Sequence, residues 1–217
     1  MKYAILAAED ERFYQHTGVD YVGVLRAAYS NLLTGGKRQG ASTITMQVAR
    51  NFFLSSEKTL TRKVYEAVLA FKIEASLTKE QILEIYINQI YLGQRAYGFA
   101  AASQNYFGKP LAQLSVAEAA MLAGLPKAPS SFNPVVNPRR AKQRQLYVLR
   151  RMREIGYLGE ADFAEAQKAP LAVKRDIDDF KVHGEYVAEM VRQMLHERYP
   201  EEVYSRGFRV YTTVRKD

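Results

Sequence analysis

The stretch TKEQILEIYINQIYLG, residues 78–93, decides the class of fold. Thr78 and Gln81 stand three residues apart in front of an apolar run, which is the pattern of a capping box at a helix start. Isoleucines then recur at helical spacing, and Gly93 supplies a stop signal. The stretch therefore predicts an α-helix that begins after Thr78 and runs to Gly93.

Similar signals occur on both sides of this stretch. Ser115 and Glu118 repeat the capping box, and Pro138 follows Asn137 as a first-turn proline after an N-cap. Asp20 can cap a helix that ends at Gly35-Gly36. Further helices are expected over residues 21–34, 116–124, 139–154 and around 185–198. The sequence thus predicts a mainly α protein.

The pattern changes after Pro170. A charged segment leads to the helix around residues 185–198, and residues 208–214 alternate apolar and polar side chains as a strand does. A single strand at a chain end needs a partner. We therefore expect residues 1–175 to form the main domain, and residues 176–217 to be a linker and the beginning of a further domain.

The composition limits the classes of function. Lysine and arginine exceed aspartate and glutamate by 31 − 23 = 8, which favours a polyanionic partner: nucleic acid, an acidic membrane surface or a phosphorylated substrate. The absence of cysteine excludes disulfides and thiolate metal sites. No apolar run approaches the roughly 20 residues that span a bilayer, and the start at Met1 lacks the pattern of a signal peptide.

A polar helix follows a basic, glycine-rich loop. One face of the helix expected from Thr43 to Asn51 carries Thr43, Gln47, Arg50 and Asn51. A solvated surface is the alternative for this face by itself. The preceding loop, residues 35–40 with Lys37, favours binding, because glycines and the free N–H groups of a helix start attract phosphate. We therefore expect an anion site here.

Two glutamates flank this region. Glu9 ends an apolar-leaning segment, so we expect partial burial to raise its pKa toward the range useful for proton transfer. Glu66 shares a helical turn with Arg62 and Lys63, which should keep it ionised. The alternatives are a solvated helix end for Glu9 and an exposed ion pair for Glu66, which stabilises a helix only weakly. The order of carboxylate, anion site and carboxylate suits sugar transfer from a diphosphate.

Four groups of residues follow one another along the chain. They are Glu9-Asp10-x-x-Phe13-x-x-His16-x-Gly18-x-Asp20; Gly40-Ala41-Ser42-Thr43-Ile44-Thr45-x-Gln47-x-x-Arg50-Asn51; Arg62-Lys63-x-x-Glu66; and Lys79 through Ile82, Tyr86, Asn88 and Gly93. In this order and spacing they closely resemble the motifs of glycosyltransferase family 51, the peptidoglycan glycosyltransferases of class A penicillin-binding proteins and their monofunctional relatives. The resemblance extends to about Arg150.

The resemblance implies a lysozyme-like helical fold with a small, mobile, membrane-facing jaw over residues 21–61, and a truncated transpeptidase domain after residue 176. It implies polymerisation of lipid II into glycan strands by inverting transfer, with release of undecaprenyl diphosphate. The carboxylate that matches Glu9 deprotonates the acceptor 4-hydroxyl. The one that matches Glu66 assists at the donor diphosphate.

The resemblance also implies a set of substrate-binding residues. The family usually has lysine where Arg50 stands; a planar guanidinium can also hold a diphosphate, bidentately, so the departure concerns contact geometry and not function. The implied set is Asp10, Phe13, His16, Lys37, Gly40, Ser42, Thr43, Gln47, Arg50, Asn51, Arg62, Lys63, Ser130 and Ser131.

The implied partners are lipid II, the lipid-linked glycan strand, a membrane surface, cell-wall assembly proteins and moenomycin-type inhibitors, with no nucleic acid. The implied location is the periplasmic face of the bacterial inner membrane, although the membrane helix that family members carry upstream of the first motif is missing here. No cofactor or metal ligand is fixed, and Mg²⁺ or Mn²⁺ at the donor diphosphate stays open.

Two other functions remain open on the residues alone. A peptidoglycan hydrolase or lytic transglycosylase would need a catalytic acid and a saccharide cleft but no anion site. A non-catalytic basic module on a membrane or nucleic acid would use the charge and the tyrosines, but it would leave Glu9 and Glu66 without a role.

Overall fold

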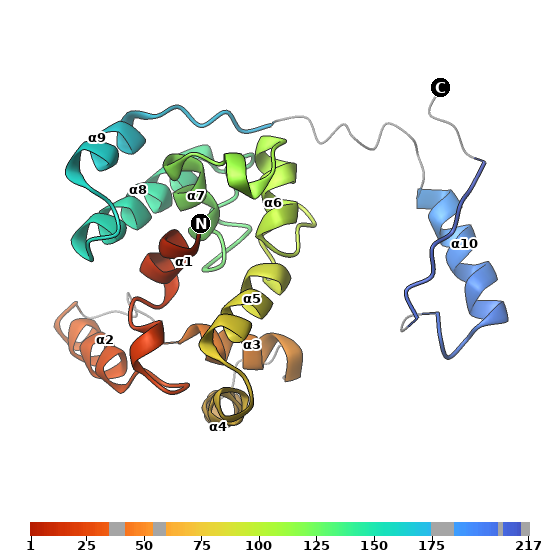
Figure 1. The fold of residues 1–217 in the computed structure, drawn as a ribbon, viewed down its shortest axis with the longest axis horizontal. Helices are drawn as coiled ribbons and strands as arrows, with labels where there is room; N and C mark the ends of the chain where they lie inside the picture. The colour runs from red at the N-terminus through yellow and green to blue at the C-terminus, as the bar shows by residue number, and fades with distance from the viewer. Residues whose placement is uncertain (35–41, 54–59, 175–184, 204–205, 214–217) are drawn as a thin grey trace. The chain divides into compact units, whose positions relative to one another are not determined.

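The computed structural model describes residues 1–34, 42–53, 60–174, 185–203 and 206–213 (Figure 1). The chain divides into two compact units, Met1–Lys174 and Arg175–Asp217. Every regular element in the described residues is helical, so the predicted mainly α class is confirmed.

The first unit holds nine α-helices among its described residues, with two short 3-10 turns. They are α1 (Lys2–Glu9), α2 (Tyr21–Thr34), α3 (Ile44–Phe53), α4 (Leu60–Ser76), α5 (Lys79–Gln89), α6 (Phe99–Phe107), α7 (Val116–Ala123), α8 (Pro138–Glu154) and α9 (Glu160–Lys168), with 3-10 turns at Phe13–Gln15 and Leu111–Gln113.

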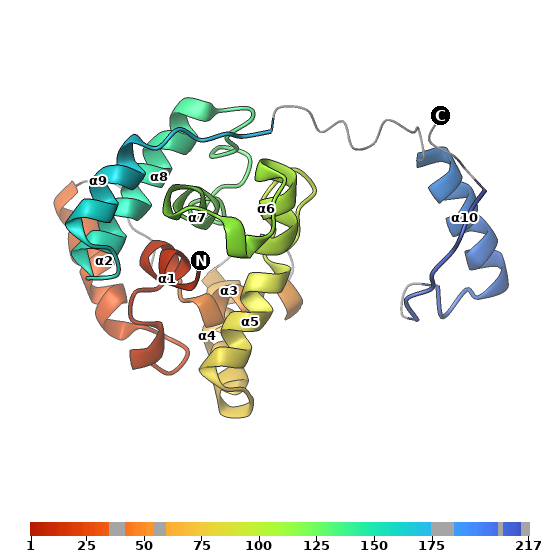
Figure 2. The ribbon, with the colours of Figure 1, turned by 45° about the horizontal axis from the view of Figure 1, so that its top comes forward.

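Helix α1 lies in the interior of this unit. It packs against α7 and α8, while α3 packs against α4 and α5 (Figures 1 and 2). Ile5 and Leu6 of α1 are buried in one apolar core together with residues of α3, α5, α6, α7 and α8. Burial of apolar surface is the main force that holds such helices together. This packing fixes the end of α1, where Glu9 stands.

The predicted helix starts agree with the structure. Thr78 accepts from the N–H of Gln81 and Gln81 reaches back to the N–H of Thr78, and the same reciprocal pair joins Ser115 and Glu118. Pro138 is the first residue of α8. Helix α2 begins directly after Asp20. Side-chain hydrogen bonds therefore set the starts of α5 and α7, and the ring of Pro138 favours the start of α8, where Asn137 makes no side-chain capping bond.

Helix α5 ends before Gly93. Ile90 already has extended backbone angles, φ −63° and ψ 134°, and Tyr91 pairs with Tyr97 in an isolated antiparallel bridge. Gly93 instead serves the turn between them, with a φ of +81° that only glycine adopts readily. The predicted helix end at Gly93 thus lies four residues beyond Gln89, the last residue of α5.

The second unit holds α10, Glu185–Arg198, at the residues predicted. In the residues that follow α10, the rings of Tyr199 and Phe208 stack with centroids 5.0 Å apart. The strand predicted over residues 208–214 is wrong for its described part, because residues 208–213 pair with no other strand. A strand needs a partner for its N–H and C=O groups, and no partner strand lies in the described residues.

Apolar side chains are exposed on two helices near the predicted anion site. Leu25, Tyr29 and Leu32 of α2 are exposed, as are Phe52 and Phe53 at the end of α3. None of the helices in the described ranges has the length and hydropathy to cross a bilayer.

Candidate active site

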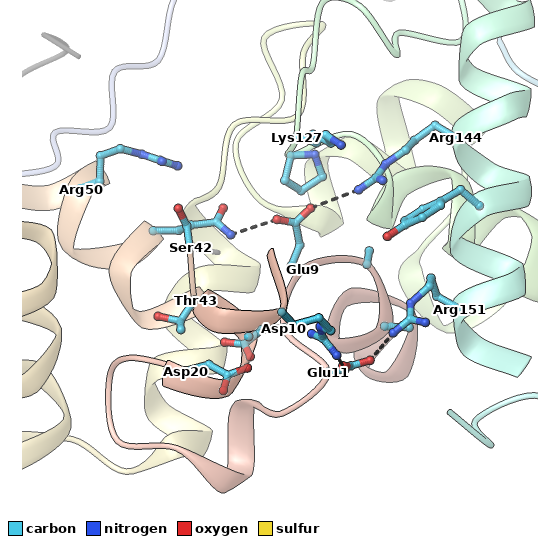
Figure 3. A pocket seen from close by; sticks show the side chains of 17 residues that line it. Glu9, Asp10, Glu11, Asp20, Ser42, Thr43, Arg50, Lys127, Arg144 and Arg151 are labelled. Atoms are coloured by element: carbon cyan, nitrogen blue, oxygen red, sulfur yellow. Dashed lines mark hydrogen bonds and ion pairs between the residues drawn. The ribbon is translucent and has the colours of Figure 1, made fainter. Parts of the chain in front are cut away.

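A pocket of about 270 Å³ opens at the C-terminal end of α1 (Figure 3). Its wall comes from α1, α2, α3, α8 and the loop after α7. The lining includes Glu9, Asp10, Glu11, Asp20, Arg26, Ser42, Thr43, Gln47, Arg50, Lys127, Arg144, Tyr147 and Arg151. The motifs quoted from the sequence supply one side of the wall, and α8 with its preceding loop supplies the other.

Glu9 is nearly buried in this pocket, and one of its two carboxylate oxygens lacks a hydrogen bond. Its side chain is 10% exposed, and Oε2 accepts a hydrogen bond from Nε2 of Gln47 at 2.9 Å. Oε1 is buried and has no hydrogen-bond partner among the described residues. Burial raises the pKa of Glu9, and the Gln47 hydrogen bond and the charges of Arg144, Lys127 and Arg50 partly offset that rise. A raised pKa makes this carboxylate a stronger base than an exposed glutamate, which suits proton transfer.

Gln47 is held in place at both ends of its amide group. While Nε2 donates to Glu9, Oε1 accepts from the hydroxyl of Tyr86 at 3.4 Å. Both Gln47 and Tyr86 are buried. Burial raises the pKa of Tyr86 well above its ordinary value, so its hydroxyl remains a donor. Gln47 therefore presents its N–H group, and not its oxygen, to Glu9.

Arg144 approaches Glu9 from α8. Its Nη2 lies 3.7 Å from Oε1 of Glu9, and its side chain is 8% exposed. Sequence reasoning missed this residue. A signal was present, because Arg144 has the spacing of the buried face of α8, which also carries Ala141, Val148 and Leu149. An arginine on the apolar face of a helix is uncommon unless it has a partner.

Lys127, in the loop after α7, was missed as well. Its side chain lines the pocket, and partial burial of its ammonium group and the nearby Arg144 lower its pKa, against the opposite effect of Glu9. Figure 3 shows Lys127 and Arg144 on one side of Glu9 and Arg50 on the other. The carboxylate is thus flanked by cations from three parts of the chain.

Asp10 stabilises the start of α3 beside the pocket. Its Oδ2 accepts from the backbone N–H of Ile44, the first residue of α3, at 3.0 Å. Nε2 of His16 lies 3.1 Å from both carboxylate oxygens. Asp10 therefore caps α3, although it was predicted to bind substrate, and it also lines the pocket. His16 contacts Asp10 and is not among the lining residues.

Phe13 lies in the core and not in the pocket wall. Its side chain is fully buried, and Nζ of Lys79 stands 4.4 Å from the centre of its ring. This cation–π contact joins the loop after α1 to the start of α5. Phe13, like His16, shapes the site by holding the elements that carry the pocket.

The polar face of α3 divides between structural contacts and the pocket. Thr43 is buried, donates from its hydroxyl to the carbonyl of Gly18 at 2.6 Å and accepts from the N–H of Met46. It is therefore a helix cap. Thr43 also lines the pocket, together with Ser42, Gln47 and Arg50, whereas Asn51 is exposed and is not among the lining residues.

Glu66 is fully buried, which excludes the exposed ion pair considered for it. Nζ of Lys63 lies 2.5 Å from its Oε2, and Nε of Arg62 lies 3.3 Å from its Oε1. Lys63 also donates to Oγ of Ser42 at 2.7 Å, which connects α4 to the pocket wall. Glu66 itself is not among the lining residues.

Glu11 joins two helices at the opposite edge of the pocket. It forms ion pairs with Arg26 of α2 and Arg151 of α8. These contacts link α2, the first helix of the predicted jaw, to the body of the unit. Glu11, Arg26 and Arg151 carried no prediction from the sequence.

The remaining predicted residues lie apart from the pocket or outside the described residues. Ser130 and Ser131 are exposed, and neither is among the lining residues. Lys37 and Gly40 lie outside the described residues, as does the whole glycine-rich loop, residues 35–40.

The residues around Glu66 do not fit a divalent metal ion. Both of its oxygens face cations, Lys63 and Arg62. No group of three or more His, Cys, Asp or Glu side chains in the described part of the chain is placed to hold a metal. We therefore derive no catalytic step through Mg²⁺ or Mn²⁺.

Comparison with known proteins places the chain in a family. The family model described as Transglycosylase matches residues 1–153. The chain belongs to the transglycosylase family. The match runs from α1 into the last turn of α8, and so contains every residue of the pocket wall.

Several known proteins are close to this chain in sequence. Penicillin-binding protein 1A of Neisseria cinerea is 58% identical over 217 residues, which are 100% of this chain and 27% of that protein. A protein of Cupriavidus necator named as a candidate transglycosylase is 60% identical over 171 residues, 79% of this chain and 74% of its own. The chain thus spans about a quarter of the length of the penicillin-binding relatives.

A solved structure was also found. The crystal structure of penicillin-binding protein 1A from Haemophilus influenzae is 34% identical, with a TM-score of 0.49 over 73% of this chain and 20% of that chain.

Proposed function

We propose that this chain is a peptidoglycan glycosyltransferase that polymerises lipid II into glycan strands. The observation that carries the proposal is a nearly buried carboxylate, Glu9, in a pocket lined with cations, within a chain of the transglycosylase family. The penicillin-binding names of its relatives agree with a cell-wall substrate.

In this reaction Glu9 takes the proton of the acceptor 4-hydroxyl. The freed oxygen attacks the anomeric carbon of the donor sugar, the bond to the diphosphate breaks, and undecaprenyl diphosphate leaves with inversion at that carbon. The raised pKa of Glu9 supports its role as the base, because a base works best with a pKa near the working pH. Gln47 fixes the direction of its carboxylate.

The cations hold the leaving group. Arg50 lines the pocket on α3, and Lys63 reaches Ser42 in the pocket wall while it pairs with Glu66. A diphosphate that develops charge as it leaves is stabilised by fixed cations in a partly enclosed site. In this proposal Glu66 positions Lys63 and Arg62 at the donor diphosphate.

The substrate also implies a setting. Lipid II and the growing strand are anchored in a membrane, and the exposed apolar residues of α2 and of the end of α3 suit contact with lipid. We place the enzyme at the periplasmic face of the bacterial inner membrane, where cell-wall assembly proteins and moenomycin-type inhibitors would meet it. The jaw over residues 21–61 is the part that would touch lipid.

One experiment separates this proposal from its alternatives. Purified protein is incubated with lipid II in detergent, and the products are separated by size. The proposal expects polymer. Fragments from preformed glycan strands, with no polymer from lipid II, would favour a hydrolase or lytic transglycosylase, and binding without any product would favour a non-catalytic basic module.

A further inference from the structure

Arg144 stands close to Glu9 without a hydrogen bond to it. Nη2 of Arg144 lies 3.7 Å from Oε1 of Glu9. Hydrogen bonds from N–H to O are about 2.7–3.2 Å long, so this contact is an ion pair of charge alone. Oε1 has no other partner among the described residues, although it is buried.

Arg144 is held at this distance by contacts on its other side. Its Nε donates to the carbonyl of Gly124 at 3.3 Å, and its guanidinium carbon lies 4.6 Å from the centre of the Tyr147 ring. The ring of Phe132 lies on the guanidinium at 5.8 Å. A Cβ at position 124 would lie 2.8 Å from Cγ of Arg144, so the close approach depends on glycine.

The distance separates two effects of a cation on a carboxylate. The attraction between charges falls as the inverse of their separation, so at 3.7 Å it keeps about three quarters of its value at a direct contact of about 2.8 Å. A hydrogen bond, in contrast, is lost over the same interval. The charge of Arg144 therefore still stabilises the ionised form of Glu9, but Arg144 donates no hydrogen bond to Oε1.

We propose that Arg144 is a positioning residue that keeps Glu9 charged inside the pocket while leaving its second oxygen unbonded. A cation in direct contact would lower the proton affinity of the carboxylate further, and loss of the cation would let burial raise it. Arg144 thus sets Glu9 between these extremes. This inference rests on the proposed function, in which Glu9 is the base.

The other groups around Glu9 do not replace Arg144. Gln47 and Tyr86 are neutral, and Asp10 turns to the N-terminus of α3 and to His16. Two further cations act on Glu9, Lys127 from the loop after α7 and Arg50 from α3, and both act less strongly than Arg144. Removal of Arg144 should therefore shift the titration of Glu9 more than removal of either.

The test measures the titration of Glu9 directly. The carboxyl carbon of Glu9 is followed by ¹³C NMR against pH in the purified protein without substrate, and its signal is assigned by its loss in Glu9→Gln. Arg144→Met keeps a chain of similar length without the charge, and we expect the midpoint to rise by roughly one pH unit or more. The acidic limb of the pH–rate profile should move by the same amount.

A matched arginine on the same helix serves as the control. Arg153 of α8 also lies over an aromatic ring, that of Phe163 at 4.4 Å, and pairs with Glu160 at 3.2 Å, but it does not line the pocket. Arg153→Met should leave the midpoint where it is in the wild type. An unmoved midpoint in Arg144→Met, or equal shifts in both variants, would overturn the proposal.

A second variant tests the distance and covers a failure of Arg144→Met to fold. Lysine keeps the charge but lacks the planar group that Gly124 and Tyr147 hold back, so in Arg144→Lys the ammonium can close on Oε1 and donate to it. The midpoint should then fall below that of the wild type, and a midpoint at or above it would contradict the inference. These titrations need no turnover, so a wild type that makes no polymer refutes the proposed function separately.

Discussion

Nε2 of Gln47 donates a hydrogen bond to Oε2 of Glu9 over 2.9 Å. Glu9 ends α1 and Gln47 lies in the middle of α3, so this bond joins two helices through residues that are 38 positions apart in the sequence. The hydroxyl of Tyr86 on α5 holds the other end of the same amide. The direction of the proposed base is thus set by three helices at once.

Replacement of Gln47 by methionine should raise the pKa of Glu9 further. The hydrogen bond favours the charged carboxylate and lowers its pKa, so its loss acts in the same direction as burial. The acidic limb of the pH–rate profile should move to higher pH. Tyr86→Phe keeps the bond to Glu9 and is the control, for which a clearly smaller shift is expected. Equal shifts would show that the bond itself is not responsible.

Glu9→Gln should lower turnover by roughly 10²-fold or more, because a neutral amide cannot accept the proton of the acceptor hydroxyl. Substrate affinity should change little, since the cations of the pocket remain. The measurement is a pair of kcat and KM values for polymerisation of lipid II. Turnover near that of the wild type would remove Glu9 from the role of base.

The same substitution should stabilise the fold at neutral pH. The pKa of Glu9 is raised above its ordinary value of 4.5 in the folded protein, so folding favours the protonated form. That stability is present below pH 4.5 and is lost as the pH rises through the folded pKa. The thermal midpoint of Glu9→Gln, minus that of the wild type, should therefore grow between about pH 4 and pH 7. A difference that shrinks over this interval would mean that burial does not dominate.

Much of the helical framework could be predicted from local signals. Thr78, Ser115 and Pro138 mark helix starts through hydrogen bonds and ring geometry that involve only neighbouring residues. The expectation that burial raises the pKa of Glu9 is confirmed as well. It could be made because the apolar residues before Glu9 are adjacent in sequence.

The other half of the pocket could not be predicted in the same way. Arg144 and Glu9 are 135 positions apart, and only the packing of α1 on α8 brings them together. The polar face of α3 was interpreted as one binding wall, and Thr43 does line the pocket, but its hydroxyl donates to the carbonyl of Gly18 and caps the helix. Spacing places residues on one face of a helix but does not tell which neighbour covers each of them.

Asp10→Ala should destabilise the protein by about 1–3 kcal/mol, because it leaves the N–H of Ile44 and the ring of His16 without their buried partner. The measurement is the midpoint of urea unfolding. Asp10→Asn keeps one oxygen that can accept from Ile44 and should cost less. A loss of turnover in Asp10→Ala with an unchanged midpoint would assign Asp10 to substrate rather than to the start of α3.

Arg50→Ala should weaken the binding of a moenomycin-type phosphoglycolipid. Arg50 lines the pocket, and loss of a charge-assisted hydrogen bond to a phosphate costs about 1.5–3 kcal/mol, roughly tenfold to a hundredfold in affinity. Arg140→Ala removes the same charge from an exposed position on α8 and controls for the net charge. Equal affinities of both variants would place the inhibitor away from α3.

Glu9 is the last residue of α1, and the last turn of that helix contains no basic side chain. The peptide dipoles of a helix add up to a partial negative charge at its C-terminus, which disfavours a carboxylate there by roughly 0.3–1 kcal/mol. Part of the proton affinity of Glu9 thus comes from the backbone of residues 2–9. This contribution persists when any single side chain around Glu9 is exchanged. An inhibitor that donates a hydrogen bond to Glu9 would therefore keep this part of its affinity in variants that carry substitutions elsewhere in the pocket wall.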